Sequence, residues 1–163
     1  MRTHPTDPRL YLVELPDFRA EPLAPELREN MEPLVAIVRW AMEYLCSPHP
    51  ELGRAGAVCP FTSPSIRRNL FFLTVMRGAD LGAAEVDDVV RRYRDWFMEM
   101  EPRDPRQAQY KTINILFPDV PRSAWSTLIE AAQERLKPEY VPHGIMIGEF
   151  HPGPPDKAAL RNP

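Results

Sequence analysis

Three side chains that could do acid/base or ion-binding chemistry each follow an apolar, strand-like run. They are Arg77, Asp119 and His151, a cation, an acid and a base from separate parts of the chain. If the three strands run parallel, their carboxyl ends meet at one edge of the sheet, where open α/β folds bind ligands. We therefore expect Arg77 and Asp119 to be catalytic residues that lie beside His151.

Each of these residues also has a structural interpretation. A His151 imidazole held after a buried strand suits a general base or an axial ligand of iron, although a lone histidine is often only a boundary residue. Asp119 could cap the helix that opens near Pro121, and Arg77 could be a solvated turn residue. The sequence leaves both interpretations open.

A second candidate site lies in the segment 59–69. Arg67 and Arg68 directly precede an apolar strand, and their guanidinium groups could hold a carboxylate or a propionate by bidentate contacts. Cys59 could be a thiolate ligand or a nucleophile, or an inert buried cysteine. We expect Cys59, Arg67 and Arg68 to bind a cofactor.

Apolar periodicity and proline boundaries predict the elements that position these residues. Helices are expected at about 33–46, 83–100 and 123–136, the last closed by Pro138, and strands at 69–75, 110–117 and 143–150. The α-β-α-β-α-β order predicts an α/β or α+β sandwich of one domain, with a small, mostly parallel or mixed sheet flanked by helices. A ferredoxin-like split with antiparallel neighbours is the alternative topology.

Proline divides the chain into three parts, since 20 of the 163 residues are prolines. We expect a Pro-rich N-terminal arm at 1–25, the α/β domain at 26–151 and a Pro-rich tail at 152–163. One strand-like run, 10–15, lies within the arm, which we expect to lie over the domain rather than in its centre.

The composition excludes several classes of function. A net charge of −3 supplies no basic field for nucleic acid, and no segment reaches the ~18 consecutive apolar residues of a membrane span. Cys46 and Cys59 lie in dissimilar contexts without ligand spacing, so neither a disulfide framework nor a zinc site is expected. The N-terminus has no apolar leader, which predicts a cytoplasmic protein.

Three runs carry a family resemblance: Cys59-Pro60-Phe61 with Pro64-Ser65-Ile66, then 115–119, and then 144–152. They resemble a family of small actinobacterial proteins that often accompanies natural-product genes. The match covers about residues 55–163. The resemblance also implies that related chains continue past the position of Pro163.

More remotely, the order of elements is similar to that of YqcI/YcgG-type haem proteins, some of which hydroxylate nitrogen on arginine or related amino acids. This resemblance implies haem as the cofactor. No haem ligand can be carried over by motif, so His151 as the iron ligand is an inference from its placement after a strand.

We therefore expect an accessory enzyme of natural-product biosynthesis, a haem-dependent oxygenase that acts on nitrogen of an amino-acid-like small molecule. The first alternative is a non-catalytic module that binds a small molecule or a partner, either as a homodimer or with another protein of the pathway. The second is a cofactor-free acid/base enzyme that uses His151 and Asp119.

Overall fold

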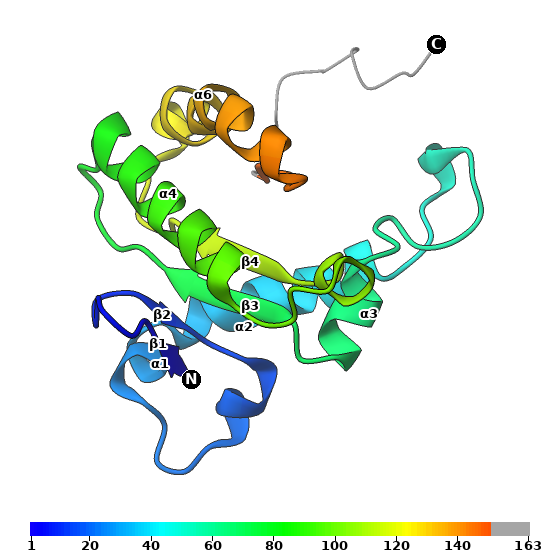
Figure 1. Ribbon diagram of the computed structural model, residues 1–163, viewed down its shortest axis with the longest axis horizontal. Coiled ribbons are helices and arrows are strands. Elements are labelled where there is room, and N and C mark those ends of the chain that lie inside the picture. The colour runs from blue at the N-terminus through cyan, green and yellow to red at the C-terminus, as the bar shows by residue number, and fades with distance from the viewer. Residues whose placement is uncertain (151–163) are drawn as a thin grey trace. The chain divides into compact units, whose positions relative to one another are not determined.

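The computed structural model describes residues 1–150, and its central feature is a pair of parallel strands (Figure 1). Strand β3, Phe71–Val75, pairs with β4, Thr112–Leu116, in a register that sets Phe71 opposite Thr112. β3 is buried at every position, whereas β4 is half-buried. The parallel pairing predicted from the sequence is confirmed for these two strands.

The N-terminal segment pairs with β3 through the residue that follows its second short strand. β1, Arg2–Thr3, pairs antiparallel with β2, Tyr11–Leu12. Val13 then exchanges two backbone hydrogen bonds with Leu73, at 2.7 and 3.0 Å, and its side chain is fully buried. The expectation that this arm lies outside the centre is therefore wrong for its strand-like run, because backbone pairing with β3 draws these apolar side chains into the core.

The longer helices lie near their predicted positions, because their apolar residues recur at helical spacing. The α-helices are α1 Pro25–Glu29, α2 Met31–Trp40, α3 Thr62–Arg67, α4 Ala83–Glu99, α5 Pro105–Ala108 and α6 Ala131–Tyr140. Two π-helical segments, η2 Ala41–Leu45 and η5 Ser126–Glu130, directly extend helices. Short 3₁₀ turns are η1 Leu15–Arg19, η3 Pro50–Leu52, η4 Arg122–Ala124 and η6 Val141–His143.

The predicted class, mixed helix and strand with small sheets flanked by helices, is confirmed, but the last predicted strand is wrong. Residues 145–150 form no regular element. Gly144 has a φ of +68° and ends η6, and the side chains of Met146 and Phe150 are 89% and 66% exposed. An apolar run becomes a strand only when a sheet edge pairs with its backbone, and in the described residues none does.

The final helix also differs from its predicted end. Pro138 lies inside α6 instead of closing it. A proline near the end of a helix removes one backbone donor, and contacts beyond it hold the last turn. The Tyr140 hydroxyl donates to the carbonyl of Val90 at 3.0 Å, and Glu139 accepts hydrogen bonds from Arg91.

Backbone proximity divides the chain into two compact units. Among the described residues, the first comprises 1–77 and 95–118, and the second comprises 78–94 and 119–150. In the first unit α2 packs its inner face against β3, which makes a core of Val13, Leu27, Leu34, Ala41, Leu45, Phe71, Leu73 and Val75. In the second unit the buried apolar side chains include Val86, Val120, Ala132, Leu136 and Tyr140.

Candidate functional site

The two parallel strands end at a common edge, as the sequence predicts. The backbone N–H of Met76, just past β3, donates to the carbonyl of Leu116 at the end of β4, at 2.8 Å. Arg77 follows β3 and is exposed. The Asp119 carboxylate accepts a hydrogen bond from the backbone N–H of Gly78, at 3.0 Å. Since Gly78 has a φ of +138°, Asp119 stabilises a glycine-dependent turn, which is a structural role.

His151, the third residue of the predicted site, lies outside the described residues. The run that leads to it is not a strand. The predicted convergence of three strand ends therefore reduces, in residues 1–150, to two strand ends. The hydrogen bond from Gly78 to Asp119 explains the turn after β3.

The second predicted site, Cys59 to Arg68, is more ordered than a loop, because α3 occupies 62–67. Arg67 donates to the hydroxyl of Ser63, one helical turn earlier, at 2.5 Å. Arg68 lies over the ring of Tyr110, 4.3 Å from its centroid. Cys59 is half-buried and packs against the core of the first unit. Both guanidinium groups thus make contacts with side chains of the first unit.

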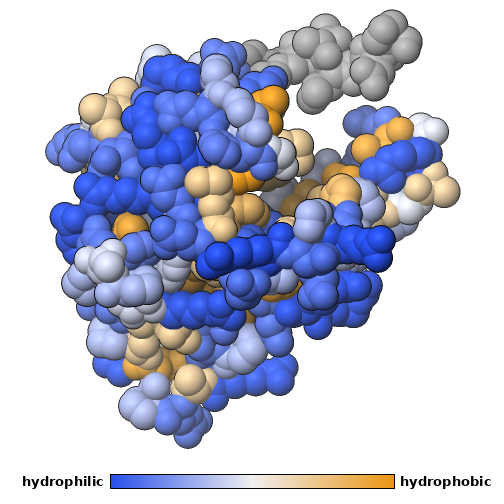
Figure 2. Space-filling model, in the orientation of Figure 1, coloured by the Kyte–Doolittle hydropathy of each residue, from blue (hydrophilic) through white to orange (hydrophobic). Residues whose placement is uncertain are grey.

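Surface hollows occur elsewhere. Figure 2 shows a largely hydrophilic face with small apolar patches. A hollow of about 240 Å³ in the second unit is lined by Lys137, Val141, Gly144, Ile145, Met146 and Ile147. Another, of about 470 Å³, lies on α2 and is lined by Met31, Glu32, Val35, Ala36 and Arg39. Of the predicted site residues that the structure describes, Cys59, Arg67, Arg68, Arg77 and Asp119, none lines either hollow.

Sequence reasoning missed Lys111, which is only 7% exposed. Its ammonium group donates to the carbonyls of Phe97, Met100 and Pro102, at 2.5, 2.6 and 3.3 Å. These lie in and just beyond the last turn of α4, where helical carbonyls lack backbone donors. Burial lowers the pKa of Lys111, while the negative charge of Glu101 opposes this. Lys111 is therefore a buried cap for the end of α4.

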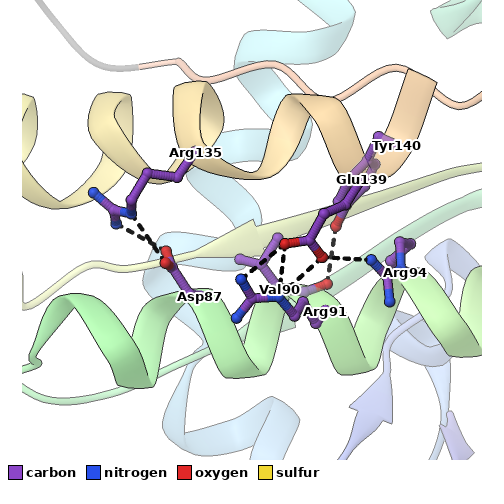
Figure 3. A network of polar contacts seen from close by, with 7 residues as sticks. All are labelled: Asp87, Val90, Arg91, Arg94, Arg135, Glu139 and Tyr140. Carbon is purple, nitrogen blue, oxygen red and sulfur yellow. Dashed lines mark hydrogen bonds and ion pairs between the residues drawn. The ribbon is translucent and has the colours of Figure 1, made fainter. Parts of the chain in front are cut away.

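The α4 helix carries Arg91, Arg92 and Arg94, and two of these arginines reach another helix (Figure 3). Arg91 and Arg94 both donate to the Glu139 carboxylate on α6, each with a contact at 2.8 Å. Hydrogen bonds from Arg91 lower the pKa of Glu139, while burial opposes the shift. Arg92 instead pairs with Asp88 in its own helix, at 2.7 Å. The arginine-rich face is thus mainly an inter-helix contact.

The part of the chain that the structure describes contains no group of three or more His, Cys, Asp or Glu side chains arranged to hold a metal ion. None of its helices is both long and apolar enough to cross a membrane.

Residues 34–163 match the model of a family described as Domain of unknown function (DUF6875). The chain belongs to this family. No curated protein and no solved structure matches the chain. In this DUF6875 protein the matched segment includes Cys59, Arg67, Arg68, Arg77 and Asp119, and it begins after β1, β2 and α1. The family description names no activity, so a functional proposal must rest on the geometry.

Proposed function

We propose that this protein is a non-catalytic binding module that works as a homodimer, joined through the outer face of α2. One observation carries the proposal: the hollow on that face is lined by apolar side chains with one acid and one base. We call its five residues, Met31, Glu32, Val35, Ala36 and Arg39, the α2 surface. Val35 is 38% exposed although it is apolar. In the described residues, neither Glu32 nor Arg39 has an ion-pair partner.

The charges of the α2 surface are complementary to a second copy of itself. Glu32 and Arg39 are placed symmetrically about a point between Val35 and Ala36. A two-fold axis through this point packs the apolar residues of two antiparallel helices together and sets each Glu32 opposite the Arg39 of the other copy. Such an interface is isologous, since the same patch serves both subunits. Two equivalent ion pairs then fix the register of the helices.

The contacts of the predicted reactive residues support a binding role over a catalytic one. Asp119 accepts a bond from the turn at Gly78. Arg67 and Arg68 contact Ser63 and Tyr110. These contacts give each side chain a structural role. The α2 surface instead presents an exposed apolar residue, Val35, between two charged residues.

Sedimentation equilibrium of the full chain over a range of concentrations tests the proposal. We expect a reversible dimer. Val35→Glu should dissociate it, because the substitution places a charge at the apolar centre of the interface. Glu32→Arg and Arg39→Glu should each weaken the dimer by opposing like charges, and the double variant should restore it by exchanging the charges.

An exposed charge outside the α2 surface supplies the matched control. Glu51→Arg reverses a charge on η3 and should leave the association unchanged. A protein that is monomeric at every concentration overturns the proposal. So does a dimer that persists in Val35→Glu, or a double variant that is no stronger than the single variants.

A second candidate is the haem-dependent oxygenation of nitrogen in an amino-acid-like substrate, within natural-product biosynthesis in the cytoplasm. The observation that favours it is that Cys59, Arg67 and Arg68 lie together around α3 in the first unit. Protein expressed with adequate iron should then show a Soret band that His151→Ala abolishes or shifts. A colourless protein that takes up no haemin contradicts this candidate.

A cofactor-free acid/base reaction through His151 and Asp119 remains a prediction of the sequence. Its activity should fall in Asp119→Asn, which keeps an oxygen that can accept the Gly78 hydrogen bond but removes the ionisable acid. An Asp119→Asn variant with unchanged turnover would exclude Asp119 from such a reaction.

A further inference from the structure

The cysteines lie on two segments that run side by side. Pro48 and Ala57 form an antiparallel bridge. The backbone N–H of Val58 donates to the carbonyl of Ser47 at 2.8 Å, and that of Cys59 donates to the carbonyl of Leu45 at 2.9 Å. The two carbonyls belong to the residues on either side of Cys46. These bonds therefore hold Cys59 directly alongside Cys46.

The electrostatics of the thiols agree with this placement. Burial raises the pKa of Cys46, and the negative charge of Cys59 raises it further. The guanidinium of Arg67 opposes both by favouring the Cys46 thiolate. The two thiols and the Arg67 guanidinium thus lie within electrostatic reach of one another. The helices η2, which Cys46 follows, and α3, which contains Arg67, are in contact.

The pairing of the two segments also favours a covalent link. A disulfide requires Cα atoms about 4.4–6.8 Å apart, and backbone hydrogen bonds hold the segment of Cys59 against the residues on both sides of Cys46. Both cysteines are free thiols and half-buried. We propose that Cys46 and Cys59 form a reversible redox site, which closes an intramolecular disulfide when the protein meets a peroxide and reopens with a dithiol reductant.

The reaction is balanced with hydrogen peroxide as the oxidant. One cysteine, as its thiolate, attacks a peroxide oxygen and becomes a sulfenic acid, while hydroxide leaves and takes up a proton to form water. The second thiol then attacks the sulfenic sulfur, the S–S bond forms and a second water leaves. Two thiols are oxidised by two electrons and one peroxide is reduced to two waters. A dithiol reverses the step by thiol–disulfide exchange.

This inference goes beyond the proposed dimer and does not depend on it, because neither cysteine belongs to the α2 surface. The disulfide would join Cys46, the residue after η2, to Cys59, the residue before Pro60, and it would close the intervening loop. Peroxide would therefore restrict the loop that contains η3.

Peptide mapping by mass spectrometry tests the site on the full chain. The protein is treated with hydrogen peroxide, its remaining thiols are alkylated, and it is digested without reduction. We expect one Cys46–Cys59 cross-linked peptide, loss of both alkylation sites and full recovery of both after dithiothreitol. Because the pKa of Cys46 is raised, the rate of closure should increase with pH above neutrality.

Single variants separate the pair from ordinary surface oxidation. Cys46→Ser and Cys59→Ser should form no intramolecular disulfide, and the remaining cysteine should be trapped by dimedone as a sulfenic acid. Circular dichroism verifies that each variant is folded. The Val35→Glu variant should close the disulfide at the normal rate. Failure of the proposed dimer can therefore be distinguished from failure of the redox site.

Three outcomes overturn the inference. Both thiols of the native protein could stay open to alkylation at a peroxide concentration that oxidises glutathione. The oxidised protein could carry only disulfides between two chains. Sulfenic acid could accumulate on the native protein without a cross-link, which would show that the sulfur atoms do not meet.

Discussion

Arg135 and Asp87 join α6 to α4 through two parallel hydrogen bonds, from Nε to Oδ2 at 3.0 Å and from Nη2 to Oδ1 at 2.8 Å (Figure 3). Asp87 is 8% exposed, so its carboxylate depends on this partner for compensation. Bidentate contacts of this kind fix both distance and orientation between two elements. The pair is therefore a structural link within the second unit.

Arg135→Met should destabilise the protein, because it leaves the buried Asp87 carboxylate without its cation. Arg92→Met is the matched control, since the Arg92 guanidinium pairs with Asp88 in its own helix. Urea unfolding followed by circular dichroism should show a clearly larger decrease in midpoint for Arg135→Met. Equal decreases would contradict the role of Arg135 as a link between helices.

Lys111→Met should lower the free energy of unfolding by about 2 kcal/mol, because buried carbonyls at the end of α4 lose their charged donor. Lys137→Met removes an exposed ammonium and should change stability by less than about 0.5 kcal/mol. Chemical denaturation of the two variants measures the difference. An unchanged Lys111→Met variant would show that the cap adds nothing beyond its packing.

The lowered pKa of Lys111 also predicts a pH dependence. Between its pKa in the folded protein and its ordinary value of 10.5, the unfolded chain binds more protons than the folded one. Stability contributed at this position therefore increases as pH is raised through that window. The native protein should gain stability relative to Lys111→Met as pH approaches 10.5. A constant difference between the two would mean that Lys111 titrates normally.

Asp119→Ala should cost about 1 kcal/mol of stability, because the backbone N–H of Gly78 loses its acceptor. Asp119→Asn keeps an oxygen that can accept the bond and should stay close to the native protein. Thermal and urea unfolding compare the two substitutions. Similar losses for both would indicate that the charge of Asp119, rather than the hydrogen bond, stabilises the turn.

Leu12→Ala tests whether the N-terminal run belongs to the core. Leu12 is fully buried, so its truncation should cost about 2–5 kcal/mol. Leu52→Ala is the control, because Leu52 is 37% exposed and its truncation should cost little. A small loss of stability in Leu12→Ala would support the sequence-based prediction that this run lies over the domain and outside its core.

The local pattern of apolar residues was sufficient to predict the longer strands and helices. The apolar runs at 69–75 and 110–117 predicted β3 and β4, and the helical spacing after Gly82 predicted α4. The helix between the two strands favoured parallel pairing, since a crossover connection needs such length, while a ferredoxin-like arrangement with antiparallel neighbours stayed open. The mixed α and β class was therefore already determined by the sequence.

Only the tertiary structure decided which side chains meet. The run at 145–150 has the composition of a strand but pairs with no strand in the described residues, whereas Val13, from a region read as an arm, pairs with Leu73. Periodicity reports the face that a segment can bury, not the partner that will cover it. For the same reason, the burial of Lys111 and the approach of Cys59 to Cys46 depend on contacts between separate segments, which no local spacing encodes.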